Sequence, residues 1–177
     1  MIKKNNIKLM VLDVDGVLTD GKLLIGSNGN EYKSFNVKDG MGISLAKYSG
    51  IIFAIITGRK SEAVRIRAKE LGIEYLFQGI SDKMEVLNDL IKELGLSKEE
   101  VCYMGDDLND LPIIKEVGLS FAPSDAIDFV KNTVTRVTTA TGGNGAVREM
   151  IESVLKEQLN YNDLINEYLI KKYNVVQ

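Results

Sequence analysis

The sequence predicts an α/β fold of the Rossmann-like, three-layer α/β/α type, in which helices cover both faces of a mainly parallel sheet. Short apolar runs such as residues 7–12 are too brief for a core helix and are typical of buried strands. They alternate with longer stretches whose apolar residues recur at helical spacing, as in residues 82–94. Strands that alternate with helices are joined by right-handed crossovers, which gives a parallel sheet.

The individual elements follow from the same patterns and from turn residues. Strands are expected at 7–12, 51–56, 75–77, 101–104, 119–122 and 133–137. Helices are expected at 41–48, 61–71, 82–94, 111–117, 126–130 and 146–158. Gly50, Gly72 and Gly95 each follow a helical stretch and serve as stop signals.

Two segments stand outside this alternation. Residues 22–35 predict a small β-hairpin, because apolar runs flank the tight-turn pair Asn28-Gly29. The tail, about 160–177, has apolar residues at helical spacing. The chain of 177 residues shows no linker or repeat, so residues 1–177 are expected to form a single domain without an inserted cap.

Composition excludes several classes of function. The net charge of -3 offers no basic surplus for nucleic acid. No run approaches the length of a membrane span and the start lacks an apolar signal core, so a cytoplasmic location is expected. A single cysteine, Cys102, excludes an internal disulfide framework. Without any histidine, serine–histidine and cysteine–histidine catalysis and the usual zinc sites are excluded, and a metal site should be rich in oxygen ligands.

Polar residues gather where strands end, at what should be one edge of the sheet. They are Asp13, Asp15, Thr57, Asp106, Asp107 and Asp110, together with Lys83 before a helix. Carboxylates this close repel one another unless a cation or a shared proton is present. With magnesium, a hydroxyl and an ammonium they make a site for phosphoryl transfer. Alternatively, the first aspartates cap turns, Thr57 caps a helix and Lys83 is solvated.

Four stretches resemble, in order, the motifs of the haloacid dehalogenase superfamily of phosphatases: DVDGVLTDG, ITGR, Lys83 and GDDLND. NVKDGMGI, LFQGISDK and GGNGAVREM resemble its small cap-less subgroup, which includes 3-deoxy-D-manno-octulosonate 8-phosphate (KDO 8-phosphate) phosphatases and sialic-acid-type 9-phosphate phosphatases. The resemblance spans about residues 7–150. It implies a magnesium-dependent phosphatase for the phosphate monoester of a 2-keto-3-deoxy sugar acid, with KDO 8-phosphate as the first candidate. An N-acylneuraminate or KDN 9-phosphate is the alternative.

The resemblance also implies roles for the motif residues. Asp13 would be the nucleophile that becomes an aspartyl phosphate. Asp15 would protonate the leaving alcohol and then activate water. The carboxylates of Asp13 and Asp106 and the backbone carbonyl of Asp15 would hold magnesium, and Thr57 and Lys83 would bind phosphoryl oxygens.

Further residues are implied around this centre. The residues expected to orient the metal's surroundings without binding the metal directly are Asp107, Asn109 and Asp110. Expected substrate contacts are Asn36, Val37, Lys38, Asp39, Gly40, Gly58, Arg59 and Arg67, besides Asp15, Thr57 and Lys83. The two arginines are candidates for a sugar carboxylate or, alternatively, surface charges. Ser44 stands where relatives commonly carry a basic residue, and Thr141 where some have histidine; both bear on which sugar acid is bound.

Two other functions remain open at this point. A phospho-aspartate receiver also combines aspartates, threonine and lysine on a parallel sheet, but here the DxD pair comes first and Lys83 precedes GDDLND. An inactive scaffold of the same fold is disfavoured by the intact motifs. The subgroup forms homotetramers in which neighbours complete the site, so the hairpin and the tail are expected to help close it. Alternatively, the tail helix packs on its own domain. On the first expectation, removing the tail alters substrate handling more than stability.

Overall fold

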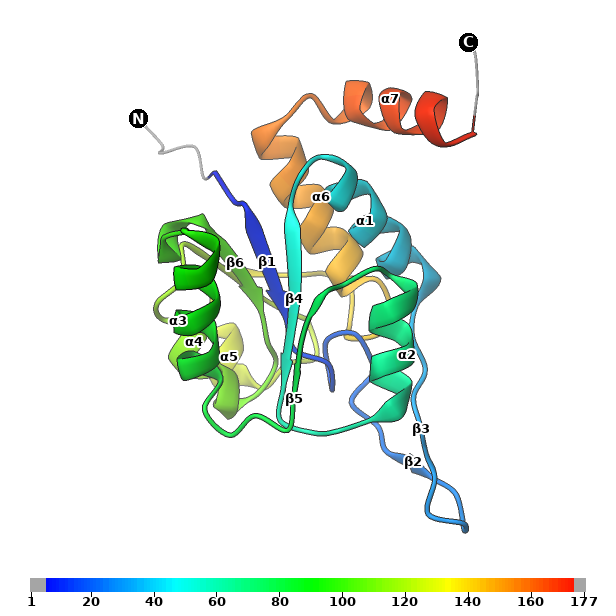
Figure 1. The fold of residues 1–177 in the computed structure, drawn as a ribbon. Coiled ribbons are helices and arrows are strands. Elements are labelled where there is room, and N and C mark those ends of the chain that lie inside the picture. Colours follow the sequence, from blue (N-terminus) through cyan, green and yellow to red (C-terminus); the bar gives the residue numbers. More distant parts are fainter. Residues whose placement is uncertain (1–5, 174–177) are drawn as a thin grey trace.

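The computed structural model describes residues 6–173, and residues 1–5 and 174–177 lie outside this range. Figure 1 shows one sheet with helices on both faces and a hairpin that extends beyond the sheet. The sheet strands are β1 (Leu9–Leu12), β4 (Ile52–Thr57), β5 (Tyr75–Gln78), β6 (Val101–Met104), β7 (Leu119–Ala122) and β8 (Arg136–Val137). The α-helices are α1 (Val37–Tyr48), α2 (Glu62–Glu70), α3 (Lys83–Leu94), α4 (Leu111–Ile114), α5 (Asp128–Lys131), α6 (Ala146–Gln158) and α7 (Tyr161–Tyr173). Two short 3-10 helices are η1 (Lys98–Glu100) and η2 (Leu108–Asp110).

The strand order is β5-β4-β1-β6-β7-β8, and every pairing in this sheet is parallel, which confirms the predicted architecture. β1 is central, and Leu9 pairs with Ile52 of β4 on one side and with Val101 of β6 on the other. The register places the carboxyl ends of β1, β4 and β6 together, as the site prediction requires.

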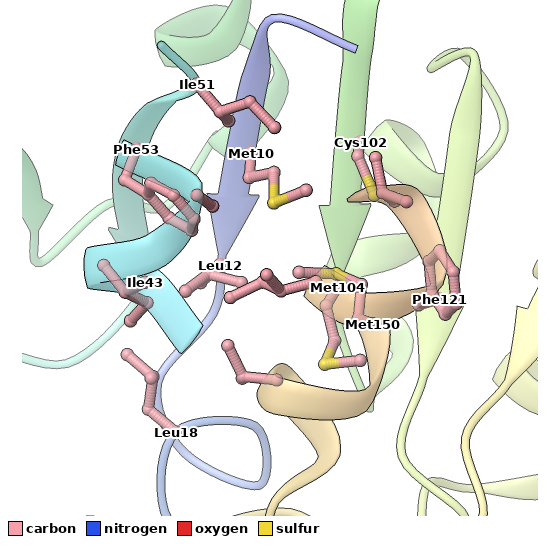
Figure 2. Packing of buried hydrophobic residues seen from close by; sticks show 14 of the residues in the cluster. Met10, Leu12, Leu18, Ile43, Ile51, Phe53, Cys102, Met104, Phe121 and Met150 are labelled. Carbon is pink, nitrogen blue, oxygen red and sulfur yellow. The ribbon is translucent and has the colours of Figure 1, made fainter. Parts of the chain in front are cut away.

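The alternation of side chains along β1 divides the core between the two faces of the sheet. Met10 and Leu12 face α1, α2 and α6, and Figure 2 shows them beside Met104 and Met150. Leu9 faces α3 and α4 on the other side. Because helices cover both faces, the strand is apolar at every position, which explains the continuous hydrophobic run.

Several element boundaries differ from the sequence prediction. Helix α1 begins at Val37 and not at 41, because the side chain of Asn36 accepts a hydrogen bond from the backbone of Lys38 at 2.8 Å and caps the helix. The segment predicted as one helix, 111–117, has its first part in α4 and is preceded by the 3-10 turn η2. The last strand, predicted at 133–137, is reduced to β8.

The hairpin and the tail lie at opposite ends of the molecule (Figure 1). The hairpin strands β2 (Leu24–Ile25) and β3 (Glu31–Tyr32) are short and extend beyond the carboxyl edge of the sheet. Helix α7 packs on α1, where Leu164 and Tyr168 are each only 7 % exposed. The ring of Tyr168 lies edge-on to that of Tyr48, with 5.4 Å between centroids. None of the helices within residues 6–173 is both long and apolar enough to cross a membrane.

Candidate active site

A cavity of about 220 Å³ opens at the carboxyl edge of the sheet, where the sequence predicts the site. Its lining consists of Asp13, Asp15, Gly21, Thr57, Gly58, Arg59, Asp106, Asp107 and Asn109. These residues come from the ends of β1, β4 and β6, which are neighbours in the sheet although they are far apart in the chain. The structure therefore brings residues of three of the four predicted motifs, all but Lys83, into the lining of one cavity.

The carboxylates of Asp13 and Asp106 have the properties of cation ligands. Asp13 Oδ1 and Asp106 Oδ1 are buried and find no hydrogen-bond partner among the described residues. Burial, followed by the negative charge of Asp110, raises the pKa of Asp13 to about 6. Burial, followed by the charge of Asp13, raises the pKa of Asp106 to about 8. These two buried oxygens accept no hydrogen bond, and without a cation their carboxyl groups ionise less readily than usual. Both properties fit a site for a divalent cation that prefers oxygen ligands.

Asp110 belongs to the same acidic group but has a different role. One oxygen each from Asp13, Asp106 and Asp110 lie within 4.8 Å of one another. However, Asp110 Oδ2 accepts hydrogen bonds from the backbone N–H groups of Asp106 at 2.9 Å and Asp107 at 3.2 Å. Its Oδ1 accepts from Lys83 and from Tyr103, each at 2.6 Å. With four donors already in place, Asp110 is suited to orienting the loop and not to binding the metal.

Tyr103 was not identified from the sequence, although a signal was present. It lies in the middle of β6, an otherwise apolar strand, and is fully buried. A buried phenol almost always needs a hydrogen-bond partner, so a tyrosine there indicates a polar group within the core. The partner, Asp110, lies seven residues further along the chain.

Lys83 lies between two of these carboxylates. Its ammonium is buried, 2.6 Å from Asp110 Oδ1 and 3.0 Å from Asp13 Oδ2. Burial disfavours its charge, but the two carboxylates outweigh burial and raise the pKa of Lys83. Lys83 is the first residue of α3, and Asp82 caps that helix by accepting from the backbone N–H groups of Met84 and Glu85. The lysine is thus a charged part of the site and not a solvated helix residue.

Thr57 is the last residue of β4 and is buried beside the cavity. Helix α2 begins only at Glu62, with Ser61 at its N-cap position. Thr57 therefore does not cap that helix, and the alternative reading of this residue is wrong. Gly58 and Arg59 follow it into the cavity wall.

Asp15 is held by charges from the hairpin. Its Oδ1 accepts a short hydrogen bond from the ammonium of Lys33, and Arg59 Nε lies 3.9 Å from its Oδ2. Glu31 pairs with both cations, at 2.9 Å from Lys33 and 2.5 Å from Arg59. Neither Glu31 nor Lys33 was predicted. Residues i and i+2 of an extended segment share a face, so opposite charges at 31 and 33 were the available signal.

The expected substrate segment 36–40 is not part of the cavity lining. Asp39 is buried and accepts from the backbone N–H of Arg148 at 2.8 Å, in the first turn of α6; burial raises its pKa. Arg67 donates to the backbone oxygen of Asn36 at 3.3 Å and pairs with Glu70 at 2.8 Å. These side chains brace the backbone, and their contact with substrate stays a prediction. The neighbouring positions differ, since Val37 and Lys38 face solvent and Gly40 is buried.

The absence of a side chain at Gly142 and at Gly16 allows the motif loops to approach closely. A Cβ on Gly142 would lie 1.9 Å from the backbone oxygen of Gly16, and Gly143 donates to Val17 at 2.9 Å. Gly16 has a φ of 85°, and a Cβ there would lie 2.0 Å from Asp106 Oδ2. Side chains at either glycine would therefore displace the loop that carries Asp15.

Comparison with known proteins identifies the family. Residues 76–151 match the haloacid dehalogenase-like hydrolases. The 3-deoxy-D-manno-octulosonate 8-phosphate phosphatase KdsC of Escherichia coli K12 is 48% identical over 156 residues, which cover 88% of this chain and 83% of that protein.

Solved structures agree with this match. The 3-deoxy-D-manno-octulosonate 8-phosphate phosphatase of Moraxella catarrhalis, crystallised with magnesium, phosphate and KDO, is 45% identical with a TM-score of 0.89. A probable YrbI family phosphatase of Pseudomonas syringae is 50% identical with a TM-score of 0.90, and each alignment covers 93% of this chain and 94% of the other. This chain therefore belongs to the haloacid dehalogenase-like hydrolases and, within them, to the family of the 3-deoxy-D-manno-octulosonate 8-phosphate phosphatases.

Proposed function

We propose that this protein is a magnesium-dependent phosphatase that hydrolyses KDO 8-phosphate to KDO and inorganic phosphate in the cytoplasm. The observation that carries the proposal is the pair of buried, unpartnered carboxylate oxygens on Asp13 and Asp106, beside the ammonium of Lys83. This arrangement presents a nucleophile, a cation site and a phosphate ligand next to one another at the carboxyl edge of the sheet. The substrate follows from relatives that share almost half of the residues of this chain.

The first step transfers the phosphoryl group to Asp13. A carboxylate oxygen of Asp13 attacks phosphorus, the ester P–O bond breaks, and Asp15 gives its proton to the departing alcohol oxygen. In the second step Asp15 takes a proton from water, and the water oxygen attacks phosphorus. Phosphate leaves, and the carboxylate of Asp13 is regenerated. The carboxylates of Asp13 and Asp106 and the backbone carbonyl of Asp15 would hold magnesium, which would neutralise charge on the phosphoryl oxygens.

The remaining residues position the reacting groups. Lys83 and the hydroxyl of Thr57 bind phosphoryl oxygens, since both side chains are buried: Thr57 ends β4 beside the cavity, and the Lys83 ammonium at the start of α3 lies 3.0 Å from Asp13 Oδ2. Asp110 keeps Lys83 and the Asp106 backbone in place through its hydrogen bonds. Asp107 and Asn109 lie in the wall of the cavity and orient water around the metal.

The sugar acid occupies the outer part of the cavity. Arg59 lines this part, and its guanidinium matches the geometry of the sugar carboxylate. Asn36, Val37, Lys38, Asp39 and Gly40 remain the proposed substrate segment although they do not line the cavity, and Arg67 supports the backbone of this segment.

We further infer that the chain works as a homotetramer of single-domain subunits. The hairpin exposes Leu24 at 66% and Ile25 at 62%, which is costly in water and suits contact between copies. Neighbouring subunits would then cover the open carboxyl edge and exclude water from the phosphoryl group. In this assembly the tail would influence how a neighbouring subunit handles its substrate.

A panel of sugar-acid phosphates tests the function. We expect the highest kcat/KM for KDO 8-phosphate, with N-acylneuraminate and KDN 9-phosphates as competitors in the panel. Chelation should abolish phosphate release and added magnesium should restore it. Asp13→Asn removes the nucleophile and should lower kcat by about 10⁴-fold or more while the protein stays folded. Turnover by Asp13→Asn at the parent rate, or full activity in excess chelator, would refute this mechanism.

A further inference from the structure

Lys33 is an unusual residue for an exposed hairpin. Its neighbours Tyr32 and Ser34 are exposed to solvent, yet only 1% of the surface of the Lys33 side chain is accessible. Instead of extending into water, its ammonium turns inward to the carboxylate of Asp15. Lysine side chains usually keep their charged end in water, so a buried ammonium needs a compensating partner, and here Asp15 and Glu31 supply it.

The contact is part of a closed arrangement of four charges. Going round, Asp15 pairs with Lys33, Lys33 with Glu31, Glu31 with Arg59, and Arg59 Nε returns to within 3.9 Å of Asp15. Glu31 and Lys33 come from the hairpin, whereas Asp15 and Arg59 line the cavity. The arrangement therefore couples the hairpin to the side chain that carries the proton in the proposed reaction.

We propose that Lys33 is a positioning residue that holds the carboxyl group of Asp15 in the orientation required for proton transfer to the leaving alcohol. The inference rests on the proposed function, because it takes Asp15 as the acid–base group. Proton transfer requires the donor within hydrogen-bond reach of its acceptor, and an aspartate side chain can otherwise rotate about two bonds. Within the described residues, Lys33 is the cation in direct hydrogen-bond contact with Asp15, and Glu31 fixes the lysine in turn.

A purely structural role gives a different expectation. If Lys33 only fastened the hairpin to the domain, its loss would disturb all substrates alike. If it positions Asp15, its loss should matter most where the leaving group needs a proton. Sugar alcohols are poor leaving groups without protonation, whereas a nitrophenolate leaves readily as an anion. Comparing the two leaving groups separates the roles.

The main experiment uses Lys33→Met in the full-length, magnesium-loaded enzyme. Formation of the aspartyl phosphate is followed in single turnovers at saturating substrate, with KDO 8-phosphate and with p-nitrophenyl phosphate. We expect the rate with the sugar phosphate to fall by about 100-fold, as for a misplaced catalytic group. The rate with the aryl phosphate should fall much less. Equal losses, or a faster reaction with the sugar phosphate, would overturn the proposal.

A double variant makes the comparison sharper. Asp15→Asn alone should show the same preferential loss with the sugar phosphate, because it removes the proton donor. Adding Lys33→Met to Asp15→Asn should then cost little more, since two changes to one function are not additive. Independent, multiplying losses would contradict a role through Asp15. Equal losses for Asp15→Asn itself would instead place the error in the proposed function.

Two controls separate positioning from a folding defect. Lys22→Met removes another lysine of the hairpin segment. The Lys22 side chain is 85% exposed and pairs with Asp20 at 3.1 Å, so its loss should leave both rates unchanged.

The second control restores the charge chemically. Lys33→Cys, alkylated with bromoethylamine, returns an ammonium at nearly the same length and should recover the sugar phosphate rate. Methylthiolation of the same thiol adds no charge and should not. The native Cys102 is fully buried, and burial raises the pKa of its thiol, so it stays unmodified. Recovery by both reagents would overturn the assignment.

Discussion

Tyr103 donates its phenolic hydrogen to Asp110 at 2.6 Å in a part of the core where neither side chain is exposed. The same carboxylate holds Lys83 and the backbone N–H groups of Asp106 and Asp107. Through this single carboxylate, the hydroxyl of Tyr103 on β6 is connected to Lys83, the proposed phosphate ligand, and to Asp106, the proposed metal ligand. The positions of Lys83 and Asp106 therefore depend on a hydrogen bond between two residues that do not line the cavity.

We expect Tyr103→Phe to weaken both folding and magnesium binding. The change removes one hydrogen bond to a buried charged group, which corresponds to a loss of about 1.5–3 kcal/mol in the free energy of unfolding. Asp106 should also be held less firmly, so the magnesium concentration for half-maximal activity should rise. Urea unfolding and magnesium titration of phosphate release measure the two effects.

Tyr75→Phe is the matched control for this prediction. Tyr75 lies on β5, is half-buried, and no hydrogen bond of its hydroxyl is found within residues 6–173. It should leave magnesium dependence unchanged. A magnesium requirement in Tyr103→Phe equal to that of the parent would show that Asp110 keeps its position without the tyrosine.

Stability of the metal-free protein should depend on pH through Asp106. Its pKa is raised from 3.8 to about 8, chiefly by burial, so between these values the folded state binds more protons than the unfolded chain. The free energy of unfolding therefore contains a favourable contribution below pH 3.8, which is lost as pH rises through about 8. Asp13, raised to about 6, contributes with the same sign.

Asp106→Asn should remove this dependence at its source. In chelator, the variant should melt at a higher temperature than the parent near pH 8, and the difference should shrink on acidification. Added magnesium should stabilise the parent but not the variant, since ligand binding stabilises only a state that binds it. Asp89→Asn, which changes an exposed carboxylate on α3, is the control. A melting difference that is constant with pH would refute the assignment.

Removal of the chain after about Asn160 tests the role of the tail. The sequence alone predicts an effect on substrate handling more than on stability, but α7 buries Leu164 and Tyr168 on its own subunit. We therefore expect truncation to lower the free energy of unfolding by about 3–6 kcal/mol, from two buried side chains. We also expect KM or the rate of product release to change if the tail serves a neighbouring site.

Tyr168→Ala separates these two effects. It loosens the packing against Tyr48 while it leaves the tail in place. Stability should fall, whereas the KM for KDO 8-phosphate should stay near the parent value. Sedimentation measures the oligomeric state of the parent and of both altered proteins. A monomeric parent whose kinetics do not change on truncation would show that each subunit acts alone.

The sequence predicted the sheet and the motif residues because both depend on local pattern. Asp13, Thr57 and Asp106 each follow an apolar strand, and the strand ends can be read directly. The start of α1 was missed because Gly40 and Gly42 weaken a helical pattern. Both glycines are buried in α1: a Cβ at 40 would lie 2.6 Å from the end of the Arg67 side chain and one at 42 would lie 2.9 Å from the Arg148 side chain, so either arginine would have to shift.

The contributions of Tyr103 and Lys33 could not be predicted in the same way. Tyr103 meets Asp110 only because η2 turns back toward β6. Lys33 meets Asp15 across 18 positions of chain, through the direction in which the hairpin leaves the domain. Such contacts depend on how elements pack, and the periodicity of a single segment carries no information about them.

The central place of β1 has a consequence for how the enzyme is made in the cell. Leu9 pairs with Ile52 and with Val101. The two strands that pair with β1, which positions Asp13, are therefore synthesised 43 and 92 residues after it. Closing such long loops must come before the pairings become favourable, and chains emerge from the ribosome N-terminus first. The proposed magnesium site therefore cannot form on the nascent chain until β6 has left the exit tunnel, and a product that ends before Asp106 lacks one of the two carboxylates proposed to bind the metal.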